Sequence, residues 1–165
     1  MKKIAKIIAL VPCVLALFAA TCRSAEVGAR VPDFSVRTLG GDHLSRASLS
    51  GKPMLLVFWN TWCATCTSEL PKLNLLAEKF GPKRLTVLAI NTGLNDTESK
   101  ARAYWKKYGY TFAAGYDHSF EVGETFRIIG VPTVILVDAQ GLVRYSHTSI
   151  PRDLEERLRQ LTSLR

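Results

Sequence analysis

The chain has 165 residues, of which 47% are hydrophobic, and its 22 basic and 14 acidic residues give a net charge of +8. A chain of this length can bury one good hydrophobic core, and no internal repeat or low-complexity linker divides it. The basic residues are dispersed among acidic and aromatic side chains at helical spacing, which is typical of a solvated helix surface. We therefore expect one globular domain and no nucleic-acid partner.

Residues 1–25 are predicted to be a targeting segment, and residues 26–165 the folded domain. Three lysines near the start precede an apolar run from Ile7 to Cys22. This run is shorter than the ~20 residues of a membrane-spanning helix and suits the hydrophobic region of a signal peptide. Without the three lysines the chain carries 19 basic and 14 acidic residues, or +5. The sequence thus predicts export.

The end of this leader resembles a bacterial lipobox. Ala19-Ala20-Thr21-Cys22 would make Cys22 the lipidated residue of a membrane-attached lipoprotein, although Thr21 stands where Gly or Ala is usual. Ordinary cleavage near Ala25 and an uncleaved anchor are the alternatives. In any mature chain that begins at or after Cys22, the remaining thiol pair is that of the C-x-x-C motif described below.

After the leader, strand and helix patterns alternate. Val31–Val36, followed by glycines and an aspartate at 40–42, predicts an N-terminal hairpin. The later predicted elements, in chain order, are a buried strand Met54–Trp59, a helix Cys63–Phe80, a buried strand Leu85–Asn91, a helix Asp96–Tyr108, a strand Phe112–Asp117, a short helix Ser119–Phe126, a hairpin of Val131–Asp138 with Leu142–His147, and a final helix that opens near Pro151.

These patterns predict an α/β fold built as a three-layer sandwich. The continuous apolar strands are typical of a sheet that is covered on both faces. Apolar residues spaced by three and four positions bury one side of each helix. In the second long helix we expect Tyr104, Trp105 and Tyr108 to lie in the core.

Cys63 and Cys66 stand in a C-x-x-C motif where an apolar strand gives way to a helix. The first turn of a helix has unpaired backbone N–H groups, which stabilise a thiolate and lower the pKa of a cysteine below the ~8.5 of a free thiol. Cys66 lies one turn later on the same face and can close a disulfide. Half of a zinc site is the alternative, but zinc usually needs four ligands at recognisable spacings, and the three histidines are scattered. The pattern favours a redox pair.

The segment Phe58-Trp59-x-x-Trp62-Cys63-x-x-Cys66 resembles the thioredoxin superfamily. Its continuation to Pro71 is similar to the TlpA/ResA branch of membrane-tethered thiol–disulfide oxidoreductases. Downstream, Gly130-Val131-Pro132-Thr133 matches the cis-proline loop of the superfamily. The resemblance covers roughly 29–161 and implies a thioredoxin-like fold whose central mixed sheet carries an N-terminal β-hairpin extension.

The resemblance also implies roles for individual residues. Cys63 would attack a substrate disulfide and Cys66 would resolve the mixed disulfide. Trp62 would shield the disulfide or contact the substrate, and a cis Pro132 would turn the Val131 backbone toward an incoming extended peptide.

Minimal thioredoxins place a buried aspartate on the strand where this chain has Val57. We therefore expect Glu69, partly buried beneath the disulfide, to exchange protons with Cys66 instead. The alternative is that Glu69 only complements the dipole at the start of the helix.

The predicted function is that of an exported, membrane-attached thiol–disulfide oxidoreductase that acts as a monomer without metal or other cofactor, because the cysteines themselves carry the electrons. The resemblance implies protein disulfide substrates, such as apocytochrome c, and a membrane electron donor. One alternative is a thiol oxidase, or a reductant for another client. Another is a copper-binding module, although copper carriers of related fold use C-x₃-C and a distal histidine.

Overall fold

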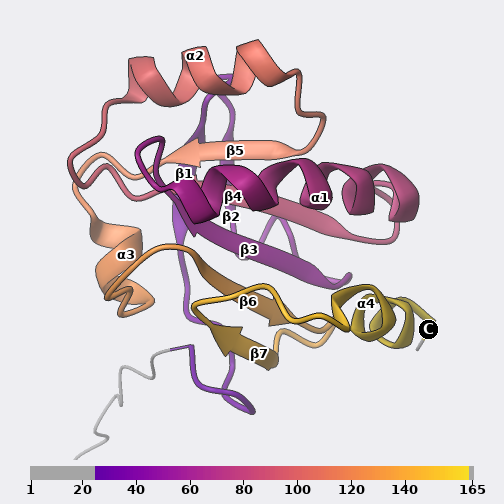
Figure 1. The fold of residues 1–165 in the computed structure, drawn as a ribbon. Helices are drawn as coiled ribbons and strands as arrows, with labels where there is room; N and C mark the ends of the chain where they lie inside the picture. The colour runs from indigo at the N-terminus through magenta and orange to yellow at the C-terminus, as the bar shows by residue number, and fades with distance from the viewer. Residues whose placement is uncertain (1–24, 164–165) are drawn as a thin grey trace, which may run out of the picture.

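The computed structural model describes residues 25–163. Its centre is a seven-stranded mixed sheet in the order β2-β1-β5-β4-β3-β6-β7, flanked by helices (Figure 1). The strands are β1 (Ser35–Thr38), β2 (His43–Ser45), β3 (Met54–Trp59), β4 (Thr86–Asn91), β5 (Ala113–Tyr116), β6 (Thr133–Val137) and β7 (Val143–His147). The helices are α1 (Ala64–Phe80), α2 (Glu98–Tyr108), α3 (Glu121–Thr125) and α4 (Leu154–Ser163).

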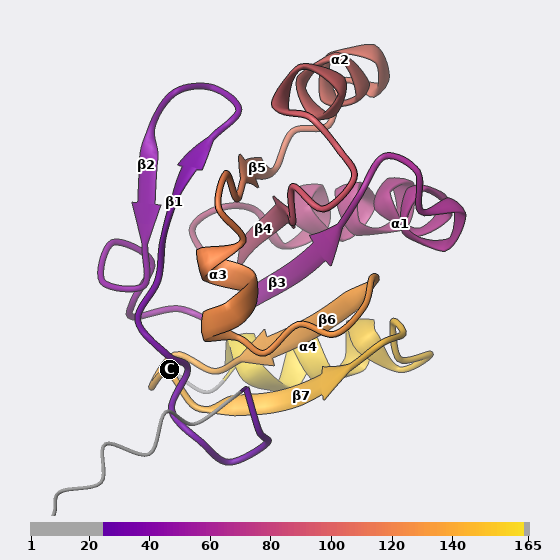
Figure 2. The same ribbon diagram turned by 90° about the vertical axis from the view of Figure 1, so that its left-hand side faces the viewer.

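The two central strands, β3 and β4, are buried along their whole length. Because successive side chains of a strand point to opposite faces, each strand contributes to two cores. Val57 and its neighbours on one face pack with apolar residues of α1, α2 and α4. Phe58 and its neighbours on the other face pack with α3 and the segment that precedes β1 (Figure 2). The predicted three-layer sandwich is confirmed, as is the N-terminal hairpin, which is formed by β1 and β2.

The strand directions determine where a site can form. β3, β4 and β5 are parallel, so their carboxyl ends meet at one edge of the sheet, on the left in Figure 1. The connection from β3 to α1 and the connection from β4 to α2 both leave from this edge. Polar side chains in the two connections are thereby brought together although they are some thirty positions apart in the chain.

Several predicted boundaries need correction. Helix α2 begins at Glu98 and not at Asp96, because the Thr97 hydroxyl accepts a hydrogen bond from the Lys100 N–H and caps the helix. Helix α4 begins at Leu154 and not near Pro151. Tyr108 is 48% exposed instead of buried.

Tyr108 packs against other side chains at the surface, and its ring centroid lies 4.5 Å from that of Tyr104 in the same helix. Its ring lies on that of Tyr110 at an interplanar angle of 13°, and the Lys107 ammonium sits 5.1 Å from its centroid. Tyr104 and Trp105, in contrast, pack against the core as predicted.

The predicted leader falls almost entirely on residues 1–24, outside the described residues, and so does Cys22. Within the described part of the chain, no helix has both the length and the apolar character needed to cross a bilayer.

Candidate active site

Cys63 and Cys66 form a disulfide at the start of α1, with an S–S distance of 2.05 Å. Cys63 is the N-cap residue, in extended backbone conformation, and its Sγ accepts a hydrogen bond from the Cys66 N–H at 3.2 Å. Cys63 is 7% exposed and Cys66 2%. The sulfur of a cysteine at the N-cap can accept hydrogen bonds from the unpaired N–H groups of the first turn. These bonds favour the charged thiolate once the disulfide is reduced.

The turn that precedes Cys63 is attached to the connection between β4 and α2. Trp62 is 55% exposed, and its indole Nε1 donates to the carbonyl of Leu94 at 2.9 Å. The Cys63 N–H donates back to the Asn60 carbonyl at 3.2 Å and closes the turn. Trp62 therefore stands beside the disulfide at the surface, where it can both shield the sulfurs and meet a substrate.

Beneath this turn lies a buried polar network that sequence reasoning missed. Asn60 Nδ2 donates to Asn91 Oδ1 at 3.2 Å, and the Thr92 hydroxyl donates to Asn60 Oδ1 at 2.7 Å. Asn91 Nδ2 donates in turn to the carboxylate of Asp96 at 2.8 Å. The available signal was the pair of asparagines that each directly follow or end an apolar strand, since parallel neighbours bring such positions together.

Asp96 is the charged member of this network and is 9% exposed. Burial by itself would raise the pKa of Asp96, but hydrogen bonds from Asn91, Thr61 and Thr97 outweigh it and lower the pKa below the ordinary value of a carboxyl. Asp96 is therefore held as a carboxylate at neutral pH.

The loop before β6 lies at the end of the sheet from which α1 departs, because Thr133 pairs with Phe58 near the end of β3. The Val131–Pro132 peptide bond is cis, and the Thr133 hydroxyl donates to the Gly130 carbonyl at 2.7 Å. Val131 packs against the core cluster that contains Cys63 and Cys66. The predicted substrate-binding loop and the start of α1 thus lie at the same end of the sheet.

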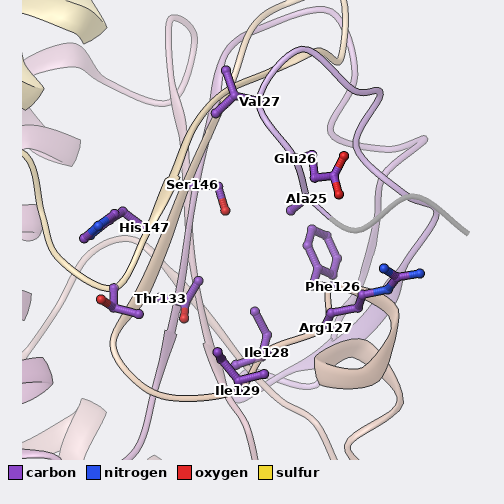
Figure 3. Close-up of a pocket in the computed structure, with 11 residues that line it drawn as sticks. Ala25, Glu26, Val27, Phe126, Arg127, Ile128, Ile129, Thr133, Ser146 and His147 are labelled. Atoms are coloured by element: carbon purple, nitrogen blue, oxygen red, sulfur yellow. The ribbon is translucent and has the colours of Figure 1, made fainter.

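A cavity of about 400 Å³ lies beside the residues that flank this loop, between the start of β6 and the end of β7 (Figure 3). Thr133, Phe126 and His147 contribute to its lining. Ile129, at the rim, is 98% exposed. The cis-proline loop is therefore bordered by exposed apolar surface.

Glu69 lies in the second turn of α1, and its side chain is 24% exposed. Its Oε1 pairs with Lys72 Nζ at 3.1 Å, and the residue lines a groove of about 600 Å³ between α1 and α4. Val57, at the strand position where minimal thioredoxins have a buried aspartate, is 2% exposed and belongs to the same core cluster as the cysteines. The contact given for the Glu69 carboxylate is with Lys72, and proton exchange between Glu69 and Cys66 stays a prediction.

Among residues 25–163 there is no group of three or more histidine, cysteine or acidic side chains placed to hold a metal ion.

Comparison with known proteins decides the family. The model of the AhpC/TSA family matches residues 27–146. The chain belongs to the AhpC/TSA family. It is 30% identical over 139 residues to the thiol-disulfide oxidoreductase ResA of Bacillus thuringiensis, covering 83% of this chain and 79% of that protein. It is 35% identical over 128 residues to the thiol:disulfide interchange protein DsbE of Tatumella citrea, covering 75% of this chain and 66% of that one.

A solved structure gives the same result for the fold of this AhpC/TSA member. MTB dsbF, in its mixed oxidized and reduced forms, superimposes with a TM-score of 0.68 at 28% identity, over 80% of this chain and 95% of that chain. The predicted thioredoxin-like fold and the resemblance to the ResA type are confirmed. The protein is a thiol–disulfide oxidoreductase with a Cys63–Cys66 redox pair.

Proposed function

We propose that this oxidoreductase works outside the cytoplasm, attached to the membrane, and reduces disulfides of exported proteins, with apocytochrome c as a candidate client. The observation that carries the catalytic part is the N-cap position of Cys63, whose Sγ meets the Cys66 N–H. The export part is supported by the lysine-rich, apolar leader and its lipobox-like end at Cys22.

The proposed reaction starts from the dithiol. The Cys63 thiolate attacks one sulfur of the client disulfide, forms a mixed disulfide and releases the first client thiolate. The Cys66 thiolate then attacks Cys63 Sγ and releases the second client thiolate. Two electrons have passed to the client, and the chain is left with the Cys63–Cys66 disulfide. A membrane dithiol donor must return two electrons to complete the cycle.

The surface around the sulfurs suits an extended client segment. The cis Val131–Pro132 bond precedes β6 at the end of the sheet where α1 begins, and Trp62, which directly precedes Cys63, has more than half of its surface exposed. We propose that the Val131 backbone pairs with the client chain while Trp62 covers the scissile disulfide. No metal or organic cofactor takes part in this sequence of steps.

The direction of electron flow can be tested in growing cells. We expect the chain in the membrane fraction with Cys63 and Cys66 mostly as thiols, because a dithiol in an oxidising compartment serves as a reductant only if a donor keeps it reduced. Acid-quenched alkylation of fractionated cells measures this state. The reduction potential should lie nearer to the about −270 mV of thioredoxin than to the about −120 mV of DsbA. A predominantly disulfide form would identify an oxidase instead.

The variant Cys22→Ser serves as the matched control for attachment in the same experiment. If a lipid anchors the chain through Cys22, this variant is released from the membrane or remains unprocessed. Unaltered retention and size would point to an uncleaved anchor, and a wild-type chain in the soluble fraction would refute membrane attachment.

We further propose that Glu69 exchanges protons with Cys66. Glu69→Gln should leave the fold intact, because the Glu69–Lys72 pair lies at the surface, where such a pair contributes at most about 1 kcal/mol. The rate of client reduction as a function of pH should change its shape, because the amide keeps the size of the carboxyl but cannot carry a proton. Glu78→Gln, on the same helix but hydrogen-bonded to Asn74, is the control. An unchanged profile would leave Glu69 as a helix-start residue.

A further inference from the structure

The carboxylate of Asp96 lies directly under the turn that leads into Cys63. Its Oδ2 accepts from the Thr61 N–H at 2.6 Å, and its Oδ1 accepts from the Thr61 hydroxyl at 2.8 Å. The same two oxygens accept from Asn91 Nδ2 at 2.8 Å and from the Thr97 N–H at 2.9 Å. One buried side chain thus holds both the backbone and the side chain of Thr61.

From these contacts we propose that Asp96 is a positioning residue, which holds the turn before Cys63 so that the cysteine is delivered to the N-cap of α1. The proposal rests on the oxidoreductase activity of the Cys63–Cys66 pair and not on where in the cell, or on which client, the protein acts.

The path from Asp96 to the sulfur is short and continuous. Thr61 is held by Asp96, and the next residue, Trp62, is held through its indole by the Leu94 carbonyl of the same connection. Cys63 follows directly, with its N–H on the Asn60 carbonyl and its Sγ on the Cys66 N–H. If the hydrogen bonds between Asp96 and Thr61 are lost, the turn no longer fixes Cys63 Sγ at the N-terminus of α1.

A carboxylate is required here because all four partners are donors. An asparagine at position 96 would turn its NH₂ group either toward the Thr61 N–H or toward the Thr97 N–H, and neither backbone group can accept. The Asn91 side chain cannot flip to relieve this conflict, because its Oδ1 already accepts from Asn60 Nδ2 and from the Gly93 N–H. Asp96→Asn therefore places a donor against a donor at almost unchanged volume.

The test measures the reactivity of Cys63 in the reduced, purified chain. The rate of alkylation by iodoacetamide is followed against pH, with the label on Cys63 counted by peptide mass spectrometry. In Asp96→Asn we expect the midpoint to rise by about one pH unit and the rate at pH 7 to fall up to about tenfold, because the thiolate loses part of its N-cap stabilisation. The direction is informative, since loss of a negative charge alone would lower the midpoint.

Two variants separate positioning from charge and from general destabilisation. Glu98→Gln removes a negative charge near Asp96 without touching the turn, because Glu98 pairs with Arg102 and His118. Tyr116→Phe removes the hydrogen bond to the Asp96 carbonyl and leaves the carboxylate contacts intact. Neither variant should raise the Cys63 midpoint.

Should Asp96→Asn fail to fold, Thr61→Val decides the question. It removes only the hydroxyl bond to Asp96 Oδ1 and keeps the backbone bond, so it should raise the midpoint in the same direction by a smaller amount. An unchanged or lowered midpoint in the folded Asp96→Asn chain, or an unchanged midpoint in Thr61→Val, would overturn the proposal. If Tyr116→Phe raised the Cys63 midpoint as much as Asp96→Asn does, the carboxylate contacts would have no specific role, and the proposal would be overturned as well.

Discussion

Replacement of Cys66 by Ala should convert this oxidoreductase into a trap that accumulates mixed disulfides through Cys63. The reason is that Cys63, at the N-cap, can still attack a disulfide, while the sulfur that would resolve the product is gone. Turnover should fall by roughly 10³-fold or more, as when any member of a catalytic set that acts as a unit is removed.

The reverse variant provides the contrast. Cys63→Ala leaves Cys66, which is 2% exposed and lies inside the first turn, so no covalent complex should accumulate. The measurement is non-reducing electrophoresis with mass spectrometry of the trapped adducts, with the double variant as the blank. Equal trapping by both single variants would contradict the assignment of Cys63 as nucleophile and Cys66 as resolver.

Gly93→Ala should be among the most destabilising single substitutions near the site. Gly93 has a φ of +73°, and a Cβ there would meet the backbone carbonyl oxygen of Asp117 at 2.5 Å. The positive φ costs a residue with a Cβ about 1–2 kcal/mol. The clash adds about 1–3 kcal/mol, since a backbone oxygen cannot swing aside as a flexible side chain can. We expect a total loss of about 3 kcal/mol.

Gly109→Ala is the matched control for Gly93→Ala. Gly109 has a φ of +64°, but a Cβ there would meet no atom within 4 Å. It should therefore show only the conformational cost, about 1–2 kcal/mol. Urea unfolding of both variants in the same redox state measures the difference. Equal losses would mean that the connection after β4 moves away from Asp117 without cost.

The buried central strands and the position of the disulfide could be predicted from the local sequence pattern. The apolar runs of β3 and β4 indicated a sheet covered on both faces, and the structure buries every residue of both strands. The cysteine spacing at a strand-to-helix boundary indicated a disulfide on the first turn of α1, and it is there. These features depend on neighbours within a few positions of each other.

Helix boundaries were less predictable, because capping depends on a single hydrogen bond. Asp96 precedes α2 and looks like a helix-starting acid, yet Thr97 is the cap and Asp96 turns toward Thr61. Tyr108 follows the helical spacing of Tyr104 but stacks on Tyr110 at the surface. In both cases the helical spacing does not report the side-chain contacts that the structure shows.

The sequence by itself determined the α/β architecture and the position of the redox pair at the start of α1. Only the tertiary structure showed that Asp96, Asn91 and Asn60 form one buried network beneath Cys63. The physical reason is that β3 and β4 are parallel neighbours, so their carboxyl ends meet in space while remaining about thirty positions apart in the chain. Local periodicity reports which face a residue occupies, but it carries no information on which distant side chain will complete its hydrogen bonds.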